Sequence, residues 1–495
     1  MSEGVDEGAE GPPSRSAPGS LMASVTAGAA WVTTGRLTTQ ALQFLMGIAL
    51  ARILTPSDFG LLASVYVVFN FATVFFTFGL GNALIHRSAP TERDRSTVFW
   101  VTVVSGAVFA GLMWAVAPIA ARFFDMPGLV TLFPITGLTV ILTWGVVHRA
   151  ELQRQLRLRA VALADLTASA IGFGTMIVLA LLGAGPVSLA IGPVTTAGLS
   201  SLFVALMVRW RPRHFISRTS IRDLWGFSGG VLGFNFVNYW TTNTDNLLIG
   251  RVLGAAPLGL YNRAFNLMLL PVNQITGALG NVLFPALASI KNDLPRAGAG
   301  YLRTVRLITF VTAPVLVGMA AASAALVPFL WGNAWLGVVP MLQALSLAGV
   351  AQCVSVSTRW ALQSQGRTKL MFGVGVVTGI VRIGAMLTGL AWGATGVAWG
   401  VMIASLVAAP IELAVVGRVL QLRRAATLRA VASNLLLAAV MGVIVWFLPP
   451  WVGLDRSAAS ALAAQIGVGA TIYVVGARFA TRGAYQELCG IVRRR

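Results

Sequence analysis

The segment RILTPSDFGL at residues 52–61 returns later in the chain as RVLGAAPLGL at residues 251–260, an offset of 199 positions. The same offset pairs the tripeptide Leu80-Gly81-Asn82 with Leu279-Gly280-Asn281. A second offset, of 210 positions, pairs Arg149, Leu152, Gln153, Gln155 and Arg157 with Arg359, Leu362, Gln363, Gln365 and Arg367. Apolar helices resemble each other by chance, but polar residues and glycines that recur in the same order indicate an internal duplication.

The composition indicates that much of this duplicated chain is surrounded by lipid. Of 495 residues, 56% are hydrophobic and 11% are charged, whereas a soluble domain carries roughly a quarter charged residues. Apolar runs recur that are long enough to cross a bilayer as helices, which satisfy their own backbone hydrogen bonds. They predict about fourteen transmembrane helices, near residues 27–50, 60–84, 98–118, 129–147, 161–183, 187–208, 228–250, 258–288, 304–329, 338–358, 370–390, 395–417, 430–448 and 458–477.

The basic residues predict how the chain is oriented in the membrane. Most of the 36 Lys and Arg residues fall in alternate loops, and the opposite loops carry only Arg52, Arg122, Arg251 and Arg456. Because cytoplasmic loops are enriched in Lys and Arg, both termini are expected on the cytoplasmic side of a bacterial inner membrane. The net charge of +20 therefore reflects topology, and we expect no nucleic-acid partner.

Each copy of the repeat holds six predicted spans, so the second copy enters the membrane from the same side as the first. Such copies are related by a pseudo-two-fold axis along the membrane normal. The predicted fold is all-α, with two six-helix lobes around a central cavity and two C-terminal helices. The expected segments are a disordered cytoplasmic tail at 1–24, an N-lobe at 25–210, a basic cytoplasmic linker at 211–227, a C-lobe at 228–420, and the last two spans with a basic tail at 421–495.

Polar residues mark one face of three predicted spans, because they recur at spacings of three, four or seven residues. The stripes comprise Arg36, Gln40 and Gln43; Asn235, Asn238 and Thr242; and Asn266 and Asn273. A single Asn or Gln in a membrane can simply join two helices by a hydrogen bond, which contributes about 0.6 kcal/mol. The three stripes together predict a hydrated central cavity that binds substrate.

Ionisable residues inside spans are costly and therefore mark candidate sites. Arg36 lies roughly 14 Å into the first span at the usual helical rise. Its planar guanidinium suits a diphosphate or a uronic acid, although pairing with an acidic residue is the alternative. Arg382, midway along the eleventh span, is a second candidate for that role. Asp245 and Arg263 lie near the same ends of consecutive spans, so a mutual ion pair is expected.

Two further carboxylates lie within predicted spans. Glu412 and Asp165 are candidates for proton or cation coupling, but structural pairing near the cytoplasmic face is the favoured interpretation. The chain has two cysteines, Cys353 and Cys489, and neither has an evident partner. No disulfide framework or zinc site is implied, and we expect no cofactor and no catalytic residue.

Three segments carry a resemblance to a known family: ALARILTPSDFGLL at 49–62, GLGNALIHR at 79–87, and NTDNLLIGRVLGAAPLGLYNRAFNLMLLPVNQITGALGNVLFPAL at 243–287. They are similar to polysaccharide flippases of the multidrug/oligosaccharidyl-lipid/polysaccharide exporter superfamily, of the lipopolysaccharide or teichuronic-acid exporter type. The resemblance implies two lobes around a central cavity and alternating access that moves an undecaprenyl-diphosphate-linked glycan outward. The partners expected are that lipid-linked glycan, membrane lipids, a polysaccharide polymerase and export machinery.

Three other functions compete with this interpretation. A cation-coupled multidrug exporter of the same superfamily would carry a carboxylate inside the first span, where this chain has Arg36 and glutamines. A membrane-integral glycosyltransferase would need acidic or histidine groups on a large outward loop, and the predicted outward loops are short. A scaffold without transport activity would need no cavity between the lobes.

Overall fold

A computed structural model describes residues 18–76, 91–215, 229–453 and 459–480, and all secondary structure in these ranges is helical. The side chains of residues 18–30, 32–33, 36, 74–76, 229–238, 241–242, 424, 450 and 480 lie outside this description. Ten helical segments of the described chain are long and apolar enough to cross a membrane, and two of them, Leu129–Arg154 and Thr368–Val419, each contain successive helices. The chain is therefore a multi-pass membrane protein.

The first repeat folds into seven described α-helices, which correspond to its six predicted spans. Its helices are α1 (Pro18–Ile53), α2 (Pro56–Phe76), α4 (Glu92–Phe124), α5 (Leu129–Ile141), α6 (Val146–Arg154), α7 (Leu158–Leu181) and α8 (Pro186–Met207). The short helices α5 and α6 together form the fourth predicted span. Pairs of neighbouring helices hold this lobe together, since α4 packs on α5, α7 packs on α8, and α1 packs on α7.

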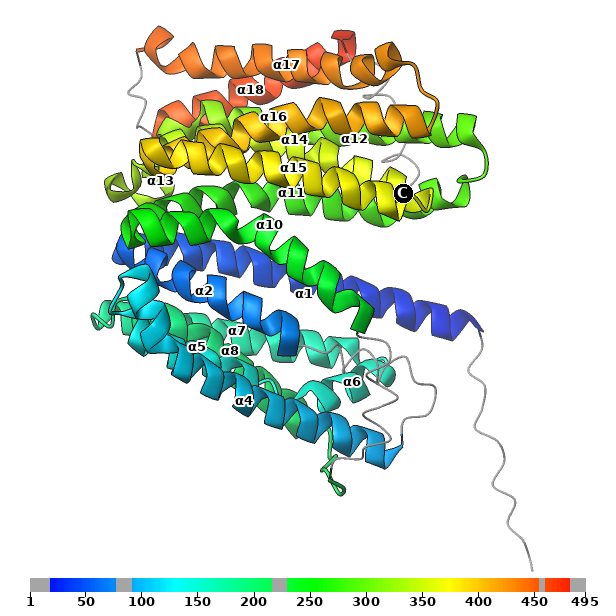
Figure 1. Cartoon of the computed structure of the whole chain (residues 1–495). Helices are drawn as coiled ribbons and strands as arrows, with labels where there is room; N and C mark the ends of the chain where they lie inside the picture. The colour runs from blue at the N-terminus through cyan, green and yellow to red at the C-terminus, as the bar shows by residue number, and fades with distance from the viewer. Residues whose placement is uncertain (1–17, 77–90, 216–228, 454–458, 481–495) are drawn as a thin grey trace, which may run out of the picture.

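The second repeat also has seven described α-helices, which correspond to its six predicted spans. Its helices are α10 (Gly229–Leu253), α11 (Ala255–Ser289), α12 (Leu294–Ala321), α13 (Ser323–Trp331), α14 (Val338–Ser364), α15 (Thr368–Gly389) and α16 (Gly393–Val419). Helix α13 extends the third span of this lobe. Helices α17 (Arg424–Trp451) and α18 (Ala459–Ala480) pack on each other, and α17 packs on α12 at the far side of the C-lobe (Figure 1).

Equivalent residues begin and join equivalent helices in the two repeats. Asp94 accepts a hydrogen bond from the backbone N–H of Thr91 (3.0 Å) at the start of α4. Asp293, its partner at the offset of 199, accepts one from the backbone N–H of Arg296 (3.1 Å) at the start of α12. Both aspartates thus satisfy backbone donors that a helix start leaves free. Gly183 (φ 80°) and Gly393 (φ 72°), related by the offset of 210, adopt left-handed conformations before the last span of each lobe.

One sequence prediction about the N-terminus is wrong in part. Residues 18–24 were expected in a disordered tail, whereas α1 begins at Pro18. The segment contains Leu21, Met22 and Ala23, which favour helix, and proline is well tolerated at a first helical position. The predicted tail up to residue 17, most of the linker at 211–227 and residues 481–495 lie outside the described residues.

The two lobes lie side by side, with α1 and α2 of the N-lobe next to α10 and α11 of the C-lobe (Figure 1). Helix α2 packs against both α10 and α11, and α1 contacts α13. One buried cluster crosses this boundary, because Ala51 and Ala63 of the N-lobe pack with Leu258, Tyr261 and Trp335 of the C-lobe. The boundary between the repeats is therefore a packed interface over part of its length.

Candidate functional site

Hydrogen bonds join the lobes at one end of the molecule, where α1 ends and where a short connection links α13 to α14. The indole Nε1 of Trp335 donates to the carbonyl oxygen of Ala51 (2.7 Å). Arg52 donates from Nε to the carbonyl of Leu330 (3.1 Å) and from Nη2 to the carbonyl of Phe329 (2.5 Å). We call this end of the molecule, with Arg52, Arg251 and Trp335, the sealed end.

Arg263 lies at the same interface and shows that one expected ion pair is wrong. Its guanidinium lies 3.8 Å from the centre of the Phe59 ring of the N-lobe and 5.8 Å from the Trp331 and Trp335 rings of the C-lobe. Cation–π contacts of this kind hold a positive charge against aromatic faces without a counter-ion. Arg263 thus stabilises the sealed end and makes no ion pair with Asp245.

Asp245 instead forms its contacts inside the C-lobe. Its side chain is completely buried; Tyr261 donates its hydroxyl to it (2.8 Å), and Nη2 of Arg382 lies 4.0 Å away. Tyr261 and Arg263 are two positions apart on α11, so their side chains point to roughly opposite sides of that helix. The face with Tyr261 meets Asp245, and the face with Arg263 meets the N-lobe.

The polar stripe of α11 is open and borders the N-lobe. Asn266 and Asn273 are exposed, and Asn266 donates to Oδ1 of Asn262, one turn earlier on α11 (2.7 Å). Gln274, the next residue after Asn273, donates to Oε1 of Gln40 on α1. The structure therefore brings the predicted residue Gln40 to the C-lobe, beside the exposed amides of α11.

Four predicted residues are not tested by these contacts. Arg36 falls on α1 and Asn235, Asn238 and Thr242 fall on α10, but their side chains lie outside the described residues. Their roles remain predictions.

The N-lobe contains a pocket that the sequence analysis did not predict. Its volume is about 560 Å³, and it lies among α1, α6, α7 and α8. The predicted residue Gln43 lines it, together with Thr39, Thr143, Gly145, Val146, Arg149, Asp165, Ser169, Phe173, Pro193, Thr196, Ala197, Ser200, Ser201 and Val204. We call this cavity the N-lobe pocket.

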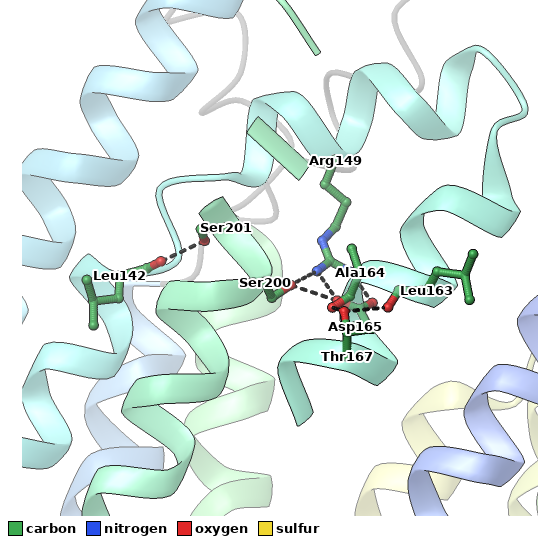
Figure 2. Close-up of polar contacts among 8 residues, drawn as sticks. All are labelled: Leu142, Arg149, Leu163, Ala164, Asp165, Thr167, Ser200 and Ser201. Carbon is green, nitrogen blue, oxygen red and sulfur yellow. Dashed lines mark hydrogen bonds and ion pairs between the residues drawn. The ribbon is translucent and has the colours of Figure 1, made fainter. Parts of the chain in front are cut away.

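An ion pair with a serine forms one wall of the N-lobe pocket (Figure 2). Arg149 on α6 donates from Nη1 to Oδ2 of Asp165 on α7 (2.7 Å) and from Nη2 to Oδ1 (2.5 Å). Ser200 on α8 donates to Asp165 (2.7 Å) and accepts from Arg149 (2.7 Å). Three helices are thus tied at one point, and the structural pairing expected for Asp165 is confirmed.

Glu412 on α16 is buried, and its Oε2 has no hydrogen-bond partner among the described residues. Ser355 and Arg359 of α14 lie near this carboxyl group. Arg359 is the repeat partner of Arg149, so each lobe sets the equivalent arginine near a carboxylate. The carboxylates come from different helices, α7 in the N-lobe and α16 in the C-lobe.

Solved structures with the same fold are membrane transporters. A lipid II flippase, MurJ, in an inward closed conformation, matches 92% of this chain and 99% of its own length with a TM-score of 0.69 at 15% identity. An inward-facing multidrug resistance MATE family transporter of the MOP superfamily matches 77% of this chain and 94% of its own length, with a TM-score of 0.59 at 17% identity. These likenesses confirm the predicted fold class.

Related sequences carry names from polysaccharide biosynthesis. The teichuronic acid biosynthesis protein TuaB of Bacillus subtilis is 26% identical over 86% of this chain and 89% of its own length. The lipopolysaccharide biosynthesis protein WzxC of Escherichia coli is 25% identical, over 78% and 80% respectively. The succinoglycan biosynthesis transport protein ExoT of Rhizobium meliloti is 26% identical, over 95% and 96%.

The family model described as polysaccharide biosynthesis protein matches residues 49–340, which include the repeated segments 52–61 and 251–260. This match covers more than half of the chain, and the predicted resemblance is confirmed. The chain belongs to the polysaccharide biosynthesis protein family.

Proposed function

We propose that this protein carries a lipid-linked oligosaccharide or polysaccharide precursor from the cytoplasmic to the outer leaflet by alternating access. The names of three relatives support this function, since they refer to teichuronic acid, lipopolysaccharide and succinoglycan biosynthesis. The fold is shared with a lipid II flippase.

The observation that carries the proposal is the packed contact between two equivalent lobes beside exposed amide side chains of α11. Two bundles related by a parallel repeat can rock against each other around a central site. Here hydrogen bonds and aromatic contacts close the end with Arg52 and Trp335. Asn266 and Asn273 remain exposed on the face of α11 that borders the N-lobe. This arrangement suits a transporter that has closed one gate.

We assign the sealed end to the outer side of a bacterial inner membrane, with both termini in the cytoplasm. The support is the distribution of charge, because Arg52, Arg122, Arg251 and Arg456 are the only basic residues in the predicted outer loops. With this orientation the substrate enters from the cytoplasmic side. A polysaccharide polymerase would then receive the glycan at the outer leaflet.

Arg36 is the proposed contact for the diphosphate of an undecaprenyl-type carrier. A guanidinium inside a membrane span favours an anionic group, and its planar fork matches phosphate oxygens. Arg382 was a second candidate, but it lies beside Asp245 within the C-lobe. We therefore assign the headgroup to Arg36, with the amides of Gln40, Gln43, Asn235, Asn238, Asn266 and Asn273 and the hydroxyl of Thr242 as contacts for the glycan.

The protein is proposed to act as a transporter and not as an enzyme. A drug exporter driven by cations would need a carboxylate in the first span, and α1 contains none. If protons or sodium ions drive transport of the glycan, a buried carboxylate such as Glu412 is the candidate to bind them.

Deletion of the gene tests this function. The strain should lose surface polysaccharide and accumulate a lipid-linked glycan in the cytoplasmic leaflet, and the intact gene should reverse both changes. Lipid extraction and glycan mass spectrometry identify the accumulated species. Normal surface polysaccharide with no accumulated intermediate would overturn the proposal.

A further inference from the structure

We propose that the N-lobe pocket is a subsite for an uncharged sugar residue of the transported glycan, an assignment that rests on the proposed function. Its volume of about 560 Å³ lies within the range of about 300–1,000 Å³ typical of small-molecule sites. It is built by four different helices of one lobe, so its shape depends on the fold of that lobe alone.

The lining of the N-lobe pocket matches the chemistry of a sugar ring. Sugar hydroxyls both donate and accept hydrogen bonds, and the pocket offers both kinds of partner. Arg149 supplies donors, Asp165 supplies acceptors, and the hydroxyls of Ser169 and Thr196 can do either. Phe173 adds an apolar aromatic face, against which the C–H groups of a ring can pack.

The charge of the N-lobe pocket favours an uncharged ligand. Among the described residues that line it, Arg149 and Asp165 are the charged ones, and they neutralise each other through two hydrogen bonds. An anion would have to compete with Asp165 for the guanidinium, and a cation would have to compete with Arg149 for the carboxylate. Breaking a hydrogen-bonded ion pair costs free energy, whereas a ligand that bonds to the remaining donors and acceptors of the pair leaves it intact. A neutral sugar can use those edges while the pair stays intact.

The position of the pocket connects it with the space between the lobes. Gln43 lines the pocket and is exposed. Gln40 lies one turn earlier on α1 and bonds to Gln274 of the C-lobe. The side chains of Arg149 and Asp165 are 35% and 38% exposed, so a ligand can reach them. A glycan held between the lobes can therefore place one of its sugar residues in the N-lobe.

The C-lobe does not repeat the three residues Arg149, Asp165 and Ser200 of the N-lobe pocket, so the two lobes differ at equivalent positions. At the offset of 210, Arg149 corresponds to Arg359, but Asp165 corresponds to Gly375 and Ser200 to Pro410. The duplicated arginine is thus kept without its two partners. Arg359 has the carboxylate of Glu412 near it instead, from α16, so the two lobes would present different contacts to a glycan held between them.

Photo-crosslinking in living cells tests the subsite. The full-length protein would carry p-benzoylphenylalanine in place of Gln43 at the mouth or Ser169 inside the pocket. The matched control is Ile171, which lies on the same helix as Ser169 and is 47% exposed. Cells that export polysaccharide would be irradiated, and adducts would be analysed by mass spectrometry. We expect hexose or N-acetylhexosamine in the adducts at Gln43 and Ser169 and none at Ile171.

The outcomes separate this inference from the proposed function. Ser169 is buried and its replacement can disturb folding, so p-benzoylphenylalanine in place of Phe173, a half-buried aromatic residue of the pocket lining, decides the test if that variant is absent from the membrane. Adducts without sugar, or with only a uronic acid or diphosphate, overturn the subsite when the intact gene restores export. If the intact gene restores no export, the proposed function itself fails.

Discussion

Gly60 and Gly259 are equivalent residues of the two repeats, and each faces the first residue of the other's helix. A Cβ atom on Gly60 would lie 1.7 Å from the carbonyl oxygen of Ala255, and one on Gly259 would lie 1.9 Å from that of Pro56. Ala255 and Pro56 are themselves equivalent at the offset of 199. Helices α2 and α11 therefore cross about the pseudo-two-fold axis that the repeat predicts, with backbone against backbone.

Replacing either glycine by alanine should weaken the sealed end. The added methyl group must push α2 and α11 apart, since backbone atoms cannot give way as a side chain can. Overpacking of this kind costs about 1–3 kcal/mol, which corresponds to a roughly 5- to 150-fold shift between two states. The reporter is a single thiol, introduced by Ala63→Cys into a protein from which Cys353 and Cys489 have been removed. This thiol should react faster with a water-soluble maleimide in the Gly60→Ala and Gly259→Ala variants than in the protein that keeps both glycines.

Gly111→Ala is the matched control for both variants. It is also a helical glycine, on α4, but a Cβ there would have no atom within 4 Å. Labelling of the thiol should stay at the original rate in this control. Equal labelling rates in all three variants would show that the crossing does not limit opening of the sealed end.

Arg52 and Arg251 should contribute unequally to the seal, although they are repeat partners. Arg52 donates two hydrogen bonds to carbonyl oxygens of α13, and hydrogen bonds of charged groups contribute about 1.5–3 kcal/mol. Arg251 lies over the Phe123 ring at 5.6 Å, an exposed contact worth about 0.5–1 kcal/mol. Arg52→Gln should increase labelling of the Ala63→Cys thiol more than Arg251→Gln. The reverse order would contradict the asymmetry.

Asp245 and Arg382 should behave as a coupled pair in stability measurements. Asp245→Ala leaves the guanidinium of Arg382 without its counter-charge inside the C-lobe, a loss of about 3–5 kcal/mol for a buried pair. Arg382→Met should restore much of the thermal stability of purified Asp245→Ala protein. Arg263→Met is the control and should not restore it, because Arg263 packs on Phe59. Rescue by Arg263→Met and not by Arg382→Met would contradict the observed pairing.

Arg36→Ala should abolish polysaccharide export while the protein still inserts into the membrane. The reason is the loss of the proposed contact with the diphosphate headgroup. Arg36→Lys keeps the charge but not the planar fork, so partial export is expected. Surface polysaccharide and membrane protein levels are measured in the complemented deletion strain. Normal export by Arg36→Ala would remove the anion-binding role.

The repeat made much of the fold predictable, because polar residues and glycines are constrained in both copies. The match of segments 52–61 and 251–260 predicted two equivalent six-span lobes, and these segments meet at the crossing of Gly60 and Gly259. Each predicted span corresponds to one described helix or to two successive ones. Boundaries shifted where helix-forming residues continue beyond the apolar run, as they do at the start of α1.

The side-chain partners were less predictable, because spacing along one helix does not identify the face of its neighbour. Asp245 and Arg263 are close in sequence, yet Asp245 meets Arg382, which only the packing of α10 and α15 brings near. The N-lobe pocket was missed for the same reason. Its signal was the series Asp165, Ser169 and Phe173 on α7 beside Thr196 and Ser200 on α8, which becomes a cavity only when both helices pack with α1 and α6.

Distances between spin labels at both ends of the lobes test alternating access most directly. One pair replaces Ile53 and Val252 near the sealed end, and the other replaces Arg157 and Arg367 at the opposite ends of the lobes; all four are exposed, and each pair is equivalent in the repeat. Pulsed electron paramagnetic resonance would be recorded with and without extracted lipid-linked glycan. The account predicts that the first distance lengthens as the second shortens. Two distances that stay fixed in a protein that restores export would contradict it.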